Sequence, residues 1–134
     1  METSPIRHAL EVRNPRHLDP MVVDVARAHN VAIVISHASE WPCLEIDTAD
    51  FTYIRLHGPG RLYKSGNSTH QLSEWSASIR TRNSQGRDVF VYFDNDGEAH
   101  APKDASTLIK LLESSSGPSV LGDCASLGGS RDND

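Results

Sequence analysis

The stretch "FTYIRLHG" (residues 51–58) has the composition of a buried β-strand but carries charged side chains toward its end. Aromatic and β-branched residues, which favour strands, alternate there with Arg55 and His57. Successive side chains of a strand point to opposite faces, so Tyr53, Arg55 and His57 are expected on one face. The other face, expected to meet helices, carries Thr52, Ile54 and Leu56. The polar face therefore ends in ionisable groups at the carboxyl end of the strand.

Two further stretches repeat this arrangement. In "DVFVYFDND" (88–96) the same alternation places Phe90, Tyr92 and Asp94 on the polar face and leaves Val89, Val91 and Phe93 for the helices. In "RHALEVR" (7–13) the alternation places on one face Arg7, Ala9, Glu11 and Arg13. Because ligands bind at the carboxyl ends of the strands in parallel α/β folds, the convergence of three such ends predicts a site.

The segments between these strands predict helices and one more strand. "LDPMVVDVARAHN" (18–30) is expected to form a helix capped by Asp19, and "VAIVIS" (31–36) an unbroken strand covered on both faces. Residues 37–50 are expected to form a loop. "STHQ" (68–71) has the pattern of a capping box before a helix with Leu72, Trp75 and Ile79 on its buried stripe. A last helix, opened by Pro102, is expected to place on one side Ala105, Leu108, Ile109 and Leu112.

This alternation of strands and helices predicts parallel pairing, because each return to the sheet requires a long crossover. The fold class is therefore α/β. Four parallel strands can form either a small open sheet or half of an eight-stranded barrel, and the pattern itself does not choose between them.

Composition limits the size and the partners of the folded part. The chain has 134 residues, and its Ser- and Gly-rich segment 114–134 predicts a disordered tail, which leaves a single domain over residues 1–113. A net charge of -5 argues against nucleic acid as a partner. The chain has no apolar run of membrane-spanning or signal-peptide length, so no membrane association is expected. Cys43 and Cys124 lack the spacing of a zinc site or a disulfide framework, which favours the cytoplasm.

Six blocks of the sequence resemble the YecE-like proteins, a family also known as domain of unknown function 72. They are "LEVRNP" (10–15), "NVAIVIS" (30–36), "TADFTYIRLHG" (48–58), "LSEWSASI" (72–79), "DVFVYFDND" (88–96) and "HAPKDASTLIKLL" (100–112). The family is understood as a TIM-type barrel of roughly twice this length, so the resemblance implies its C-terminal half only, which is the last four strand-helix units. The positions it implies for a site are Glu11, Arg13, Arg55, His57, Gly58, Tyr63, Tyr92, Asp94 and Asn95.

These residue types suggest acid-base chemistry on a small anionic metabolite. Glu11 is the expected general acid or base, because partial burial at a barrel mouth moves a carboxyl pKa toward neutrality, and His57 is the second candidate. Arg13 and Arg55 are expected to bind the anionic group of a substrate. The expected substrate-binding set is completed by Tyr63, Tyr92, Asp94 and Asn95. No cofactor is indicated by any motif.

Other readings of the same residues stay open. The charged groups can form a buried ion network with a purely structural role. Metal binding by Glu11, His57, Asp94 and His37 is a weaker alternative, because no ligand spacing supports it. The chain can also be a non-catalytic, truncated half-barrel that forms a homodimer or pairs with another half-barrel, since exposed sheet edges favour association, or an inactive remnant.

Overall fold

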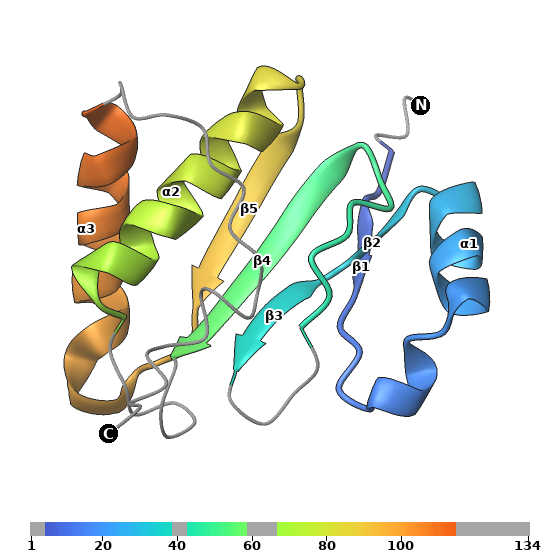
Figure 1. The fold of residues 1–134 in the computed structure, drawn as a ribbon, viewed down its shortest axis with the longest axis horizontal. Helices are drawn as coiled ribbons and strands as arrows, with labels where there is room; N and C mark the ends of the chain where they lie inside the picture. Colours follow the sequence, from blue (N-terminus) through green and yellow to red (C-terminus); the bar gives the residue numbers. More distant parts are fainter. Residues whose placement is uncertain (1–4, 39–42, 59–66, 115–134) are drawn as a thin grey trace, which may run out of the picture.

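The computed structural model describes residues 5–38, 43–58 and 67–114, and all structural statements below concern these residues. Strands and helices alternate along them, as expected for an α/β fold (Figure 1). The elements are β1 (His8–Leu10), η1 (Pro15–His17), α1 (Pro20–Ala28), β2 (Val31–Ile33), β3 (Ile35–Ala38), β4 (Phe51–Gly58), α2 (Thr69–Ser84), β5 (Asp88–Phe93), η2 (Gly97–Ala99) and α3 (His100–Glu113).

The paired strands run parallel and lie beside one another in chain order. β1 pairs with β2, β3 pairs with β4, and β4 pairs with β5. The strand expected over residues 31–36 is not continuous: it divides at Val34 into β2 and β3 and extends to Ala38. The division has a physical reason, because β1 pairs with the first part and β4 with the second, so the neighbouring strands are staggered. The amide of Val34 donates to the carbonyl of Leu10 at 2.9 Å and keeps the two parts connected to β1.

The predicted starts of α1 and α2 are confirmed, whereas α3 begins at His100, two residues before the expected Pro102. The Asp19 side chain accepts a hydrogen bond from the Val22 amide at 3.0 Å, which caps the first turn of α1. Ser68 and Gln71 form the reciprocal bonds of a capping box at the start of α2. Local sequence signals therefore determine where these two helices begin.

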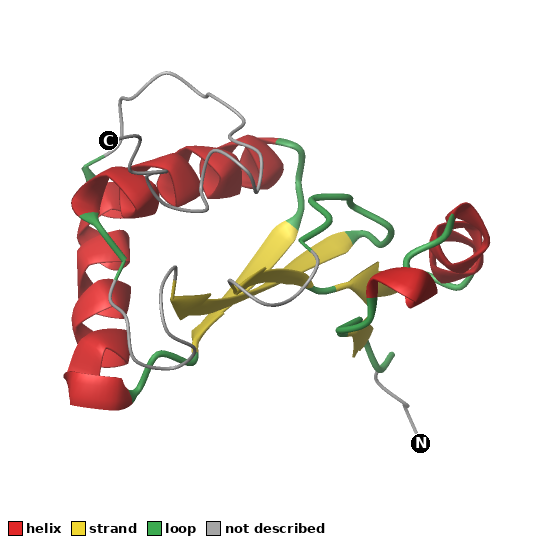
Figure 2. Ribbon diagram, turned by 60° about the horizontal axis from the view of Figure 1, so that its bottom comes forward, coloured by secondary structure: helices red, strands yellow, loops and turns green. Residues whose placement is uncertain are grey.

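The core lies between the sheet and the two later helices. α2 and α3 cover one face of β3, β4 and β5, and the other face is left open by the described elements (Figure 2). Val89, Val91 and Phe93 pack against this core, which confirms the expected alternation of β5. The fully or nearly fully buried apolar side chains of the core are Ile35, Ile54, Leu56, Leu72, Trp75, Ile79 and Leu108.

The buried side of α3 differs from the expected one. Ala105 and Leu112 are half-buried and Leu108 is buried, but Ile109 is 55% exposed. The reason is geometric: one residue advances a helix by about 100°, so Ile109 lies on the flank of α3 beyond Leu108. The fold described here leaves that flank uncovered.

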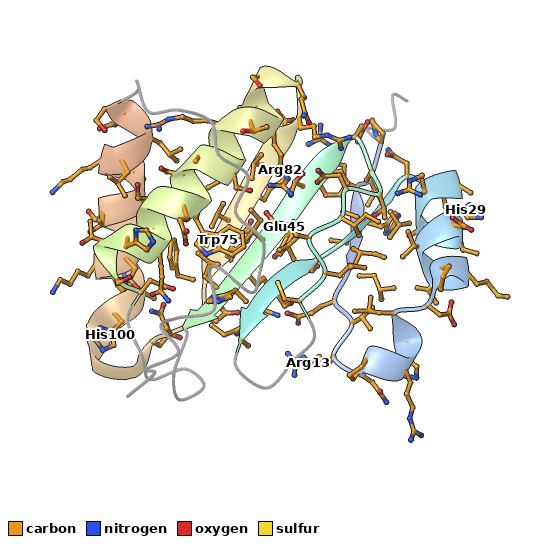
Figure 3. All side chains as sticks on the ribbon, in the orientation of Figure 1. Arg13, His29, Glu45, Trp75, Arg82 and His100 are labelled. Carbon is orange, nitrogen blue, oxygen red and sulfur yellow. The ribbon has the colours of Figure 1, made fainter. Side chains whose placement is uncertain are left out.

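A second buried cluster fixes the crossover before β4 onto α2. The Arg82 side chain lies 3.4 Å from Glu45 Oε1 and 3.2 Å from Asp47 Oδ1, and the Ser78 hydroxyl donates to Glu45 Oε1 at 3.0 Å. Figure 3 shows Glu45 and Arg82 meeting between α2 and the sheet, near Trp75. Residues 43–50 have no regular secondary structure, as expected of a loop, and these ion pairs hold them in place. Cys43 in this segment packs against the core, and Cys124 lies outside the described residues.

Candidate functional site

Glu11 lies just beyond the end of β1 and is the centre of a cluster of polar side chains. Its carboxylate accepts hydrogen bonds from the Ser36 hydroxyl at 2.7 Å and from Arg55 Nη1 at 2.6 Å. His57 Nε2 lies 3.3 Å from Oε1, and Arg13 Nη2 donates to Oε2 at 3.3 Å. The alternation of three separate strands therefore brings these groups together, as the sequence predicts.

Arg55 connects the two carboxylates of the cluster. Its Nη1 donates to Glu11 and its Nη2 donates to Asp94, which follows β5. The pairing of β4 with β3 and β5 places Arg55 beside Ser36 on one strand and beside Tyr92 on the other. A guanidinium group has five N–H donors in a planar fork, so two of these bonds leave further donors available.

His57 is fully buried behind the two carboxylates. Its Nε2 faces Glu11, and its Nδ1 lies 3.6 Å from Asp94 Oδ2. Because an ionised carboxylate only accepts hydrogen bonds, the contact with Glu11 requires the proton of the ring to be on Nε2. His57 thus holds the Glu11 carboxylate in one orientation.

The surroundings of Glu11 and His57 shift their pKa values. Burial acts to raise the pKa of Glu11, but hydrogen bonds from Ser36 and His57, together with the charge of Arg55, lower it below its ordinary value. Burial lowers the pKa of His57, and the Arg55 charge adds to this effect against the hydrogen bond with Glu11. Glu11 is therefore ionised and His57 neutral at pH 7. The expectation that the Glu11 pKa approaches neutrality is wrong, because hydrogen bonds outweigh burial.

An open pocket of about 450 Å³ lies along the uncovered face of the sheet. The Tyr53 and Tyr92 rings stack there with centroids 5.0 Å apart, and Phe51 meets Phe90 edge to face at 6.1 Å. Arg7 lies over both phenylalanine rings, 5.4 and 5.8 Å from their centroids, and pairs with Asp88 at 2.9 Å. The lining is completed by Ala9, Glu11, Val34 and Arg55.

The charges that line this pocket are unequal. Arg7 and Arg55 contribute two positive charges, and Glu11 contributes one negative charge. Burial and the neighbouring Tyr92, Asp94 and Glu11 raise the pKa of Tyr53, so its hydroxyl is protonated at neutral pH and can donate a hydrogen bond. The pocket thus combines aromatic walls with two guanidinium groups, each paired with a carboxylate, and the carboxylate of Glu11.

The remaining predicted site residues are distributed differently. Arg13 contacts Glu11, but its side chain is 53% exposed and lies outside the pocket lining, at the lower edge of the sheet in Figure 3. Asn95 is buried apart from the cluster and donates to Asp104 Oδ2 at 2.9 Å. Asp104 also accepts from the amide and side chain of Asn67, so this second group joins β5, α2 and α3. Tyr63 lies outside the described residues.

Two residues of the site were not identified from the sequence. Ser36 ends the apolar stretch of residues 31–36 and is the second residue of β3, where it lies beside Arg55 of β4. Alternation applied to β3 would have placed Ser36 on the same face as Arg55. Arg7 had been assigned to the face of Glu11, but its contact with the phenylalanine rings depends on the curvature of the sheet. That curvature leaves no local sequence signal.

The weaker alternative of a metal site gains no support from the described residues. No group of three or more His, Cys, Asp or Glu side chains has metal-binding geometry within residues 5–38, 43–58 and 67–114. Arg55 lies between Glu11 and Asp94, and His37 points to the helix-covered face, where its ring meets Trp75 at 5.9 Å.

Comparisons with known proteins agree on one family. The model of the family described as "Protein of unknown function DUF72" matches residues 1–123. A DUF72 family protein from Enterococcus faecalis is similar in structure, with 18% sequence identity and a TM-score of 0.70, over 84% of this chain and 49% of that one. A DUF72 family protein from Thermotoga maritima has 22% identity and a TM-score of 0.71, over 81% of this chain and 47% of that one. No curated protein matches the chain.

The chain thus spans about half the length of the solved structures that it matches. Within the part that the structure describes, every helix is too short or too polar to cross a membrane.

Proposed function

Because this chain belongs to the DUF72 family, whose function is unknown, we propose from the geometry of its own pocket that it binds a small anionic ligand and acts on it by acid-base chemistry. The observation that carries the proposal is the joint lining of one aromatic pocket by Arg7, Arg55 and the ionised Glu11. Ligands of α/β-barrel proteins bind at the carboxyl ends of the strands, where Glu11 and Arg55 lie.

Anion binding is supported by the unused donors of the two arginines. Arg55 uses one N–H for each carboxylate, and Arg7 uses one for Asp88. Both guanidinium groups retain further N–H donors for a carboxylate or phosphate oxygen. The rings of Tyr53 and Tyr92 form a flat surface beside them, which favours a ligand with a planar or ring-shaped body.

Glu11 is the group that supports proton transfer. It is ionised at neutral pH and lines the pocket, so it is placed to accept a proton from the ligand. His57 is too deeply buried to touch a ligand in the pocket, and it acts as a positioning residue for Glu11. This division of roles differs from the sequence-based expectation, in which both residues were catalytic.

Binding can be measured with simple probes. Inorganic phosphate, benzoate and the neutral benzyl alcohol are titrated into ¹⁵N-labelled protein, and the amide resonances of Ala9 and Val34 are followed by NMR. We expect benzoate to shift these resonances and Arg7→Met to weaken its binding by at least about tenfold, because one charge-assisted hydrogen bond contributes about 1.5–3 kcal/mol and every 1.4 kcal/mol is a factor of about ten. Arg27→Met, which removes an exposed charge of α1, is the matched control. Equal binding of benzyl alcohol and benzoate would contradict an anion site.

Catalysis is tested at Glu11 itself. For any anionic probe that the protein converts, Glu11→Gln is expected to abolish turnover while leaving binding within about threefold, because the amide keeps the shape of the side chain but cannot accept the proton. Unchanged turnover would remove Glu11 from the mechanism.

A second candidate, a non-catalytic half-barrel that associates with another half, is favoured by a specific observation. Phe90 and Tyr92 are 38% and 49% exposed on the open face of the sheet, which a closed barrel would bury. The strands are parallel and in chain order, as in a barrel, and the chain spans about half the length of its structural relatives. A mass measurement in solution tests this reading, since a monomer that unfolds cooperatively at every concentration would contradict it.

A further inference from the structure

We propose that His57 is a proton relay, which passes protons between the carboxylate of Asp94, after the end of β5, and the carboxylate of Glu11 in the pocket. The inference rests on the proposed proton transfer at Glu11 and adds to it the route by which the proton enters and leaves. Such a route matters because a ligand that fills the pocket shields Glu11 from water. The ring acts through Glu11 and does not touch the ligand.

The imidazole ring of His57 is completely buried and lies between the two carboxylates. Its Nε2 is 3.3 Å from Glu11 Oε1, and its Nδ1 is 3.6 Å from Asp94 Oδ2. Both nitrogens of the ring therefore face a group that can accept or return a proton. An imidazole ring transfers a proton without moving, because one nitrogen gains a proton while the other loses one.

The two carboxylates have different surroundings. Glu11 lines the pocket and its side chain is 15% exposed, whereas the Asp94 side chain is 28% exposed and lies outside the pocket lining. Water therefore reaches Asp94 without entering the pocket. The ring thus connects a carboxylate on the ligand side to a carboxylate on the solvent side.

Backbone pairing and a side-chain hydrogen bond hold the three groups in place. The amide of Asp94 donates to the carbonyl of Leu56 at 2.9 Å, which fixes Asp94 beside the end of β4, where His57 lies. The Ser36 hydroxyl donates at 2.7 Å to Oε1 of Glu11, the same oxygen that faces the ring. The approach of both carboxylates to the ring is therefore built into the fold.

The charges around the ring favour a proton that stays on it only briefly. Burial and the charge of Arg55 lower the pKa of His57, against the hydrogen bond with Glu11 and the charge of Asp94. The ring is therefore neutral at rest, with its proton on Nε2. Unprotonated Nδ1 and the Asp94 carboxylate are both acceptors, which accounts for their separation of 3.6 Å. A proton placed on Nδ1 converts this contact into a charge-assisted hydrogen bond.

One inward transfer consists of three proton movements. Asp94 takes a proton from water or from a buffer acid and passes it to Nδ1, so that the O–H bond on Asp94 breaks and an N–H bond forms. The resulting imidazolium gives up its Nε2 proton, and an O–H bond forms on Glu11 Oε1. The ring is then neutral again with its proton on Nδ1, the solvent has lost one proton and Glu11 has gained one. The outward transfer follows the same steps in reverse.

Exchange of the ring proton in D₂O tests the relay in the free protein. The Nε2 proton of His57 is followed by ¹H–¹⁵N NMR and is assigned among the seven histidines as the signal that His57→Gln removes. We expect it to exchange faster than the backbone amide of the buried Ile54, because the relay replaces it through Glu11 and pocket water without opening of the sheet. Asp94→Asn and Glu11→Gln are each expected to slow this exchange by at least about tenfold, since a positioned acid or base contributes about 10²–10⁴-fold to a proton transfer.

The control variants separate the relay from a purely structural role. Asp96→Asn removes an exposed carboxylate two residues from Asp94 and should leave the exchange rate unchanged. Asp94→Glu keeps a carboxylate and should exchange within about threefold of the wild type, well above the rate of Asp94→Asn. A variant that only loosens the fold would accelerate the exchange, so slower exchange is specific to the relay. Far-UV circular dichroism checks that each variant is folded, and Asp94→Ser replaces Asp94→Asn if the latter is unfolded.

Two results would overturn the inference. One is a wild-type ring proton that exchanges no faster than the Ile54 amide, and the other is exchange in folded Asp94→Asn that is as fast as in the wild type or faster. The measurement needs no ligand, so it is independent of the benzoate titration. A failure of benzoate to bind would refute the proposed anion site, while the proton exchange through His57 would stand.

Discussion

Replacing Arg55 with Met is expected to destabilise the fold through the two carboxylates that it separates. Arg55 donates one charge-assisted hydrogen bond to Glu11 and one to Asp94. Each such bond contributes about 1.5–3 kcal/mol, so both together contribute roughly 3–6 kcal/mol. The Arg55 side chain is 27% exposed, so water can partly solvate the Glu11 and Asp94 carboxylates in the variant. We therefore expect a loss of about 3 kcal/mol in the free energy of unfolding at pH 7, toward the lower end of this range.

The loss is also expected to depend on pH. Without Arg55, the carboxylates of Glu11 and Asp94 repel each other and the pKa of at least one of them rises. A proton bound at pH 4.5 relieves this repulsion in the variant, whereas the lowered pKa of Glu11 keeps the wild-type carboxylate ionised. The difference in the free energy of unfolding between the wild-type protein and Arg55→Met should therefore decrease to less than about half of its pH 7 value.

Urea unfolding followed by circular dichroism at pH 7 and pH 4.5 measures both effects. With a urea dependence of about 1.5 kcal/mol/M, the pH 7 loss moves the midpoint by about 2 M. Arg13→Met is the matched control, since its side chain is 53% exposed and contacts the same carboxylate at 3.3 Å, and it should cost less than about 1 kcal/mol. Equal losses for the two variants, or a loss for Arg55→Met that is the same at both pH values, would refute the reasoning.

Three further predictions concern stability. The pKa of His57 is lower in the folded protein than in the unfolded chain, so the unfolded chain binds a proton first as pH falls, and the free energy of unfolding should decrease below about pH 6.5. His57→Gln should flatten this part of the plot of urea midpoint against pH. The same pH dependence in both proteins would contradict the prediction. Trp75→Ala should cost about 3–5 kcal/mol in urea unfolding because the side chain is completely buried, and a cost below 1 kcal/mol would place the core elsewhere. Asn95→Ala should lower the free energy of unfolding by about 1–3 kcal/mol, because Asn95 donates a hydrogen bond to Asp104. Benzoate binding, measured by the same NMR titration, should stay unchanged. Weaker binding at equal stability would show that Asn95 belongs to the ligand site.

The sequence was sufficient to predict which aromatic and aliphatic side chains of the strands face the core. Period-two alternation assigned the two faces of β4 and β5, and capping residues gave the starts of α1 and α2, because these patterns depend only on neighbours within one turn or one strand. The meeting of Glu11, Arg55 and His57 followed from the same alternation once the strands were taken as parallel. The identity of the polar face was therefore predictable.

Contacts between distant segments were not predictable in this way. The division at Val34, the exposed flank of Ile109 and the position of Arg7 over Phe51 depend on stagger, helix rotation and sheet curvature. The same holds for the pKa of Glu11, whose direction is the balance between burial and several hydrogen bonds.

The amino-acid sequence by itself determined the order of the elements, the faces of the strands and the residues that form the polar end of the sheet, because local spacing encodes all three. Only the tertiary structure decided that Glu11 is an ionised carboxylate held by Ser36, Arg55 and His57, and that Asn95 bonds to Asp104 instead. The physical reason is that the pKa of a carboxyl group and the partner of an amide depend on distances of a few ångströms between segments far apart in the chain.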